Sequence, residues 1–160
     1  MKKNMRGFTL IQLVIVIIII GILSVLVTVS WPGTSPNVGP QAEQVAADLR
    51  YMQNLAITQH ASYRVNFSNG SYTFTQLDGT TAINHPATNS NTMTLTSGIT
   101  LSTSNLPNNY IVFNAQGTPE TDTSGTDLAT TATVTLTNGD QTYQISIIPG
   151  TGTVQKPLKI

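Results

Sequence analysis

The chain has 160 residues, of which only 9% are charged, and its formal net charge is zero. Three of its seven basic side chains precede residue 8, so the remainder is slightly acidic and lacks the basic surface expected of a nucleic-acid-binding protein. Because the chain contains no cysteine, an exported domain would have to rely on its core and its sheet hydrogen bonds. About 130 residues follow the apolar N-terminal segment, enough for one small domain.

The N-terminal segment combines positive charge with a long apolar run. Lys2, Lys3 and Arg6 precede the apolar residues 8–31, and no charged residue occurs between Arg6 and Glu43. As a helix this run would be ~36 Å long, against ~30 Å of hydrocarbon in a bilayer. The basic residues before the run predict a cytoplasmic N-terminus. We therefore predict one membrane-spanning helix over residues 8–31.

Secretory signals and plain signal anchors share some of these features and stay open as alternatives. An ordinary secretory signal has an apolar region of about 7–15 residues followed by a small-residue cleavage site. The run here is longer, and residues 29–32 (Val, Ser, Trp, Pro) make a poor site. A plain signal anchor would also cross the membrane, but would not be processed.

A hinge and a second helix are expected next. Residues 32–40 contain three prolines and two glycines, which predict a break between helices. The second helix is expected over residues 41–59, with His60 as a helix-end residue. Its apolar residues recur at spacings of three and four and form one stripe. They are Ala42, Val45, Leu49, Met52 and Ala56.

From residue 61 onward the apolar pattern has a period of two, which predicts strands. One hairpin is expected around Asn69 and Gly70, with a type I′ turn, and a second around Asn138 and Gly139. Shorter strands are expected at 92–95, 99–101, 110–113 and 153–155, with a loop over 78–91. The predicted fold class is α+β: a long N-terminal helix followed by a small, mainly antiparallel β-domain within residues 41–160.

The N-terminal residues resemble the leader of type IV pilins and type II secretion pseudopilins, in which Gly7 and Phe8 would flank the cleavage site. The resemblance implies a leader peptide over residues 1–7, removed by a prepilin peptidase, and N-methylation of Phe8. It implies a single-pass anchor in the bacterial inner membrane with a periplasmic domain, later transferred into a pilus or pseudopilus. The implied partners are other major and minor subunits and an inner-membrane assembly platform.

Gln12 departs from this family's usual sequence. It is the fifth residue after the implied cut, where most members have Glu, which is thought to pair with the N-terminal amine of a neighbouring subunit. Gln can form hydrogen bonds but cannot neutralise an ammonium group in an apolar setting. The resemblance therefore implies a minor subunit that starts or caps the filament. Neutral replacement by a near-isostere is the alternative.

The later elements narrow the resemblance. A helix around residues 46–56, an immediate hairpin and the segments 111–117 and 145–154 resemble the GspH/FimT-type minor pilin and pseudopilin domain. Within it they are similar to the minor pilins of mannose-sensitive haemagglutinin pili. The implied function is structural, in assembly, initiation or capping of a filament. The alternatives are a pseudopilin that contacts exported substrate, or a module for adhesion or DNA binding that displays loops 78–91 and 122–130 at the tip.

Candidates for catalysis or metal binding are few. His60 and His85 have no Cys, Asp or Glu at ligand spacing, and no nucleophile or nucleotide-binding motif occurs, so neither an enzyme nor a cofactor is expected. The one weak metal candidate is the acidic loop with Glu120, Asp122 and Asp127. It is similar to the start of a calcium loop, but Thr131 stands where the bidentate carboxylate belongs, which favours a solvated loop.

Overall fold

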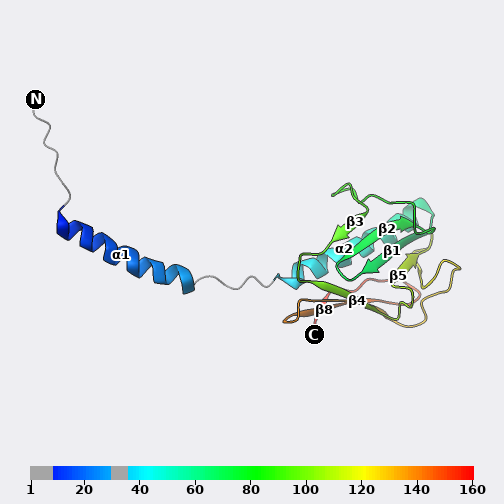
Figure 1. Cartoon of the computed structure of the whole chain (residues 1–160). Helices are drawn as coiled ribbons and strands as arrows, with labels where there is room; N and C mark the ends of the chain where they lie inside the picture. The colour runs from blue at the N-terminus through cyan, green and yellow to red at the C-terminus, as the bar shows by residue number, and fades with distance from the viewer. Residues whose placement is uncertain (1–8, 30–35) are drawn as a thin grey trace, which may run out of the picture. The chain divides into compact units, whose positions relative to one another are not determined.

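A computed structural model describes residues 9–29 and 36–160, so Gly7, Phe8 and the hinge residues 32–35 lie outside the described chain. The chain divides into two compact units, Met1–Thr34 and Ser35–Ile160 (Figure 1). The first contains helix α1 (Leu10–Val29). No helix among the described residues satisfies the combined length and hydropathy of a membrane span.

The second unit begins with helix α2 (Val38–Gln59), which starts three residues before the expected Gln41. The cause is Asn37, whose side chain caps the helix by accepting the backbone N–H of Gly39 at 3.2 Å. Pro40 falls within the first turn, where its missing N–H leaves no hydrogen bond unmade. The expected helix end is confirmed, because His60 adopts a left-handed conformation (φ 51°) and its N–H closes the last turn.

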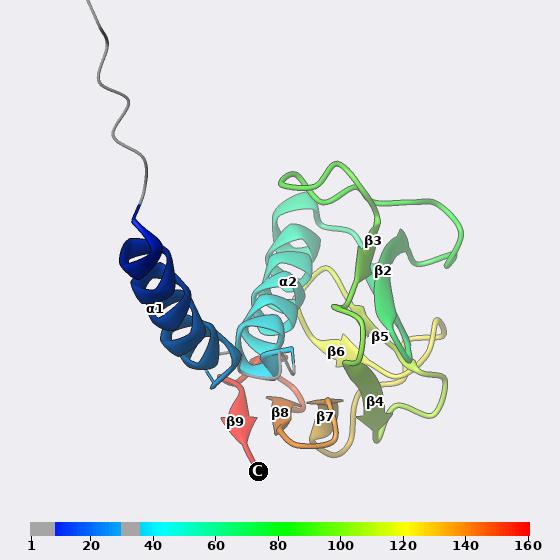
Figure 2. The same ribbon diagram turned by 60° about the vertical axis from the view of Figure 1, so that its left-hand side comes forward.

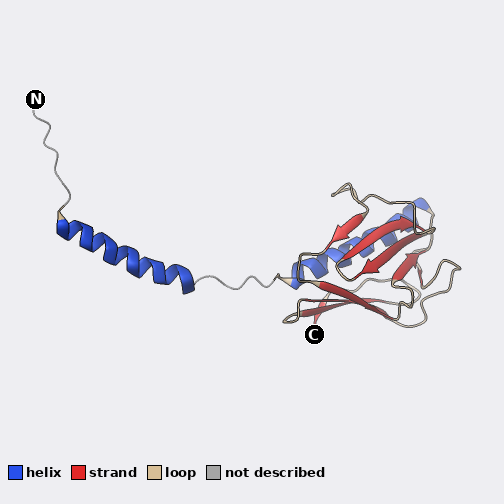
Figure 3. Ribbon diagram, viewed as in Figure 1, coloured by secondary structure: helices blue, strands red, loops and turns tan. Residues whose placement is uncertain are grey.

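Two antiparallel sheets complete the α+β fold that the sequence predicts (Figure 3). The first has the strand order β3-β2-β1-β5-β6 and the second the order β4-β7-β8-β9. The strands of the first sheet are β1 (Tyr63–Ser68), β2 (Ser71–Gln76), β3 (Thr92–Thr94), β5 (Tyr110–Phe113) and β6 (Pro119–Glu120). Those of the second are β4 (Thr100–Ser104), β7 (Ala132–Thr137), β8 (Thr142–Ile147) and β9 (Leu158–Lys159).

Both expected hairpins are confirmed, but the first does not have the expected turn. Ser68 pairs with Ser71, so Asn69 and Gly70 form a two-residue loop. A type I′ turn needs a positive φ at both positions, and neither residue has one. Their carbonyl groups accept the backbone N–H groups of Leu101 (2.7 Å) and Leu95 (2.9 Å). These tertiary hydrogen bonds explain why the local preference of the Asn-Gly pair does not decide the turn.

The strands on either side of Ser97 and Gly98 separate into different sheets. β3 pairs with β2 in the first sheet, whereas β4 pairs with β7 in the second. The segment between them therefore carries the chain from one sheet to the other. The expected segment near residues 153–155 forms a single bridge between Val154 and Ile147, and the terminal strand β9 has no counterpart in the sequence-based expectation.

The core lies where α2 packs against both sheets. Helix α2 contacts β1 and β5 of the first sheet and β7 and β8 of the second, and Figure 2 shows β7 and β8 beside its N-terminal turns. All five residues of the expected stripe are at most 1% exposed. Strands β1 and β7 alternate buried and more exposed residues, as a sheet with one face on the core requires.

Leu49 tests this packing, because its side chain lies in the middle of the stripe and is 1% exposed. We expect Leu49→Ala to lower the free energy of unfolding by about 2–5 kcal/mol, from lost burial and the cavity left behind. Urea denaturation of the unit Ser35–Ile160 measures this change. The control is Leu158→Ala, at a position 66% exposed, which should change stability by less than about 0.5 kcal/mol. Equal effects of the two substitutions would contradict the assignment of the core.

Candidate functional site

Gln12 lies in the first turn of α1, where its side chain has a local partner. Its Oε1 accepts the backbone N–H of Thr9, the residue before the helix, at 3.0 Å. Thr9 and Gln12 have the spacing of a capping box, in which a Gln or Glu at the third helical position reaches back to the capping residue. The predicted assembly residue thus stabilises the start of α1 within its own chain. The predicted processing residues Gly7 and Phe8 lie outside the described residues.

Two of the three carboxylates of the weak metal candidate, Glu120 and Asp122, accept hydrogen bonds within the protein. The third residue, Asp127, forms an isolated β-bridge with Glu120. Glu120 is buried in β6 and accepts a hydrogen bond from Asn114 Nδ2 at 2.8 Å. Asp122 accepts the backbone N–H groups of Ser124 (2.8 Å) and Thr126 (3.1 Å), and the Thr126 hydroxyl at 2.6 Å. The hydroxyl bond is the main cause that lowers the pKa of Asp122. Nowhere in residues 9–29 and 36–160 do three His, Cys, Asp or Glu side chains converge as metal ligands.

A buried polar cluster that sequence spacing could not predict is centred on Asp48. This side chain lies on the buried face of α2 and is only 5% exposed. The Tyr72 hydroxyl, from β2, donates to Asp48 Oδ2 at 2.6 Å. His85 Nε2, from loop 78–91, lies 3.5 Å from Asp48 Oδ1. The three residues come from a helix, a strand and a loop, so only tertiary packing brings them together.

The imidazole of His85 also packs against aromatic rings. Its centroid lies 5.0 Å from that of Tyr51 on α2, in an edge-on arrangement, and 6.0 Å from that of Phe74 on β2. The middle of loop 78–91 is therefore held against the core by His85. The expectation that this segment is a loop is confirmed, since it contains no strand beyond isolated bridges.

Burial sets the electrostatics of this cluster. Burial is the largest influence on the pKa of the Asp48 carboxyl and raises it. The hydrogen bond from Tyr72 and the charge of His85 both lower this pKa, but by less. Burial also raises the pKa of Tyr72, and the hydrogen bond to Asp48 adds to the increase. Tyr72 therefore stays a hydrogen-bond donor at all physiological pH values. The cluster holds loop 78–91 on α2, and none of its three residues lines the cavity at the end of the first sheet.

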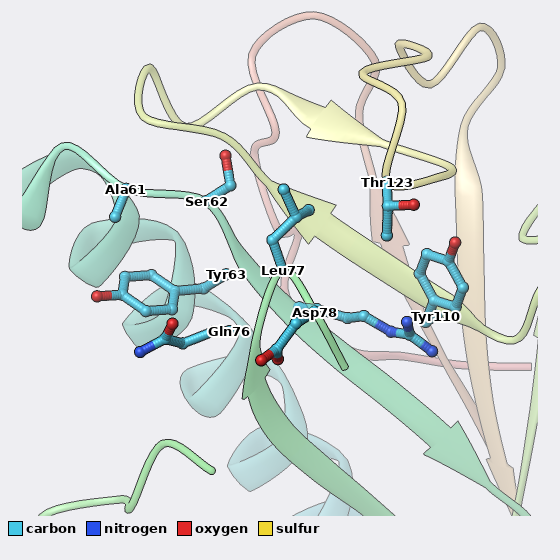
Figure 4. Close-up of a pocket in the computed structure, with 9 residues that line it drawn as sticks. Ala61, Ser62, Tyr63, Gln76, Leu77, Asp78, Tyr110 and Thr123 are labelled. Atoms are coloured by element: carbon cyan, nitrogen blue, oxygen red, sulfur yellow. The ribbon is translucent and has the colours of Figure 1, made fainter. Parts of the chain in front are cut away.

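A cavity of about 730 Å³ opens at the end of the first sheet (Figure 4). Its walls include Tyr63 and Arg64 of β1 and Tyr110 of β5. Both loops that the sequence marks as candidates for display reach it, through Asp78 and Thr123. The described lining includes no histidine and one carboxylate, so it lacks the paired groups that acid–base catalysis uses. It is a hollow lined by one guanidinium, one carboxylate and several neutral polar groups.

Comparison with known proteins points to one family. A family model described as type II transport protein GspH matches residues 41–151. No curated protein matches the sequence. The minor pseudopilin EpsH of the type 2 secretion system of Vibrio cholerae has a similar structure, with a TM-score of 0.55 and 17% identity, covering 74% of this chain and 94% of EpsH. The type IV minor pilin FimU of Pseudomonas aeruginosa also has a similar structure, with a TM-score of 0.53 and 18% identity, covering 78% of this chain and 92% of FimU.

The raised pKa of Asp48 has a consequence for stability. The folded state binds this proton more tightly than the unfolded chain, whose carboxyl has a pKa near 3.8. The resulting stability is fully present below that value and is lost as the pH rises from there through the folded-state pKa. We expect Asp48→Asn to remove this loss of stability. As the pH rises from 3.8 through the folded-state pKa, the free energy of unfolding of the variant should fall less than that of the wild type. Urea denaturation at a series of pH values measures the difference.

Asp122→Asn is the control, because this substitution should change the pH dependence of the free energy of unfolding in the opposite direction. Because the pKa of Asp122 is lowered, its contribution to stability is present above the unfolded-state pKa and is lost as the pH falls. The substitution should therefore reduce the loss of stability on the acid side. Identical pH profiles for Asp48→Asn and the wild type would show that the buried carboxyl does not have the proton affinity inferred from its surroundings.

Proposed function

Because the chain belongs to the GspH family of type II transport proteins, we propose that it is a minor pilin or pseudopilin. Its role is that of a structural subunit in the assembly, initiation or capping of a pilus-like filament. The observation that carries this proposal is the match over residues 41–151, together with the basic leader and apolar segment that precede them. The similar folds of a minor pseudopilin and a minor type IV pilin support it.

The proposed anchor is the apolar segment of residues 8–31. Within α1, every large apolar side chain between residues 10 and 22 is exposed in the isolated chain, from Val14 at 40% to Leu10 at 81%. An apolar surface of this extent requires lipid or other helices around it. In the proposed cycle, lipid covers α1 in the bacterial inner membrane, with the N-terminus cytoplasmic and residues 41–160 periplasmic. Packing against neighbouring helices replaces the lipid in the filament.

The proposed maturation follows from the leader. A prepilin peptidase removes residues 1–7 by cutting between Gly7 and Phe8, and Phe8 is then N-methylated. The mature chain would assemble with other major and minor subunits on an inner-membrane platform. Residues 32–37 would form the hinge between the anchor and the domain, since α2 begins at Val38.

Gln12 supports a minor rather than a major position. Its amide caps α1 locally but cannot neutralise the N-terminal amine of a neighbouring subunit in an apolar bundle. A subunit of this kind would enter the shaft less readily than one with Glu and would fit a terminal position, where one neighbour is absent.

Processing is tested by co-expressing the full chain with its candidate prepilin peptidase and measuring the intact mass. We expect a mature chain that begins at methylated Phe8, and an uncut chain for Gly7→Ile, whose bulky side chain would stand at the cleaved bond. A wild-type chain that keeps Met1, or one cut after Ser30, would contradict the filament role.

Gln12→Glu tests the assembly role, because either residue can accept the Thr9 N–H and so keep the cap while the charge changes. Co-assembly with a Glu-containing major subunit, quantified by mass spectrometry of sheared filaments, should show the wild type at substoichiometric levels and a several-fold increase for Gln12→Glu. Gln44→Glu, the same change at an exposed position of α2, should leave incorporation unchanged. Abundant wild-type chain along the shaft would contradict a minor role.

A further inference from the structure

We propose that the cavity at Arg64 binds a carboxylate of an acidic protein segment, with the guanidinium of Arg64 as the recognising group. This inference goes beyond the filament role and does not depend on it. The cavity lies entirely within the second compact unit, between the end of the first sheet and the loops that begin at Leu77 and Thr121.

Neighbouring side chains hold the guanidinium in place. Arg64 Nε donates a hydrogen bond to Asn66 Oδ1. The amide of Asn66 is itself oriented, because its Nδ2 donates to Thr75 Oγ1 at 3.2 Å. The central carbon of the guanidinium lies 3.7 Å from the centroid of the Tyr110 ring, in a cation–π arrangement. A ligand would therefore meet a group whose orientation is already set, which reduces the entropy lost on binding.

The loop after β2 adds a further support. Gly79 has a φ of +75°, and a Cβ at this position would lie 2.6 Å from Arg64 Nη1. Glycine thus allows the loop backbone to approach the guanidinium closely. The approach is made by backbone, so Gly79 itself adds no charged side chain beside the guanidinium.

The guanidinium has unused hydrogen-bonding capacity. The ion pairs among the described residues are His85 with Asp48 and Lys156 with Glu43, and none involves Arg64. Within the same part of the chain, its only hydrogen bond is the one from Nε to Asn66. The terminal nitrogens keep their N–H groups for a ligand, and a guanidinium presents these in a planar fork that matches a carboxylate.

Asp78 also lines the cavity, but it does not compete for Arg64. Its Oδ1 accepts the backbone N–H groups of Thr80 and Thr81, both at 2.9 Å, and its Oδ2 accepts the Thr81 hydroxyl. These bonds, with the Thr81 hydroxyl first, hold the pKa of Asp78 well below its usual range. Figure 4 shows its carboxylate on the side of Gln76, away from Tyr110 and Thr123. An acidic ligand can therefore approach on the Tyr110 side, where Thr123 offers a hydroxyl.

The aromatic residues favour a peptide over a sugar. The Tyr63 ring is buried and its hydroxyl donates to Gln59, while the guanidinium covers one face of Tyr110. A pyranose ring usually packs on an open aromatic face, and the cavity offers a cation in that place. Recognition of an acidic side chain by a fixed arginine is the mode that these groups support.

The test uses the full chain in nonionic detergent, titrated with the blocked peptide acetyl-Ser-Glu-Glu-Ser-amide. We expect saturable binding that shifts the NMR signal of Arg64 Nε–H, and no shift with the matched peptide in which Gln replaces Glu. Arg64→Gln should weaken binding at least about tenfold. Arg64→Lys should weaken it less, because it keeps the charge and loses the planar fork. Lys156→Gln, which removes an equal charge elsewhere on the surface, should bind as the wild type does.

Asn66→Ala separates recognition from folding, because it keeps the charge of Arg64 and removes its oriented partner. It should weaken peptide binding while the urea midpoint of the protein stays close to that of the wild type. Equal binding of the Glu and Gln peptides, equal effects of Arg64→Gln and Lys156→Gln, or no saturable binding would overturn the proposal. Tighter binding of trigalacturonate than of the peptide would assign the cavity to acidic sugars instead and overturn the peptide ligand.

Discussion

The burial of one face of α2 is the interaction on which the rest of the domain depends. The chain has no cysteine, and the two sheets have separate hydrogen-bonded strand orders. The apolar stripe of this helix packs against both sheets, and the hydrogen bond from the Leu101 N–H to the Asn69 carbonyl also links them. Met52 and Ala56 belong to the same stripe as Ala42 and Val45, which places contacts along the whole helix. Because such burial contributes in proportion to the apolar area removed from water, small losses along this stripe affect both sheets together.

Asp48 is a polar residue on this apolar face, and it holds loop 78–91 in position through His85. A buried carboxyl without partners would be costly, and here Tyr72 and His85 offset the cost from two other elements. The contact with His85 fixes the middle of loop 78–91 on the helix, and the first residues of the same loop border the cavity at Arg64. The core helix thus helps to determine where a peripheral recognition site lies.

The apolar side chains of helices α1 and α2 differ in how far they are buried. The apolar residues of α2 are buried within the domain, which forms a compact unit with a complete core of its own. Those of α1 between residues 10 and 22 are exposed. The second unit therefore has an apolar core of its own. The proposed role uses this difference, because it assigns α1 first to a membrane and then to a bundle of similar helices.

Local periodicity in the sequence is sufficient to predict several elements of the fold. The three-and-four spacing of α2, the alternation in β1, β2, β7 and β8, and the Asn-Gly pairs are sufficient to predict the helix and both hairpins, because each pattern reports one buried face. Three features depend on tertiary contacts instead: the turn at Asn69 and Gly70, the separation of β3 from β4, and the groups that Asp48 and Arg64 contact. Apart from Asn66, which is two residues from Arg64, the deciding partners are distant in the sequence or belong to the other sheet. A local pattern carries no information about a contact made across the fold.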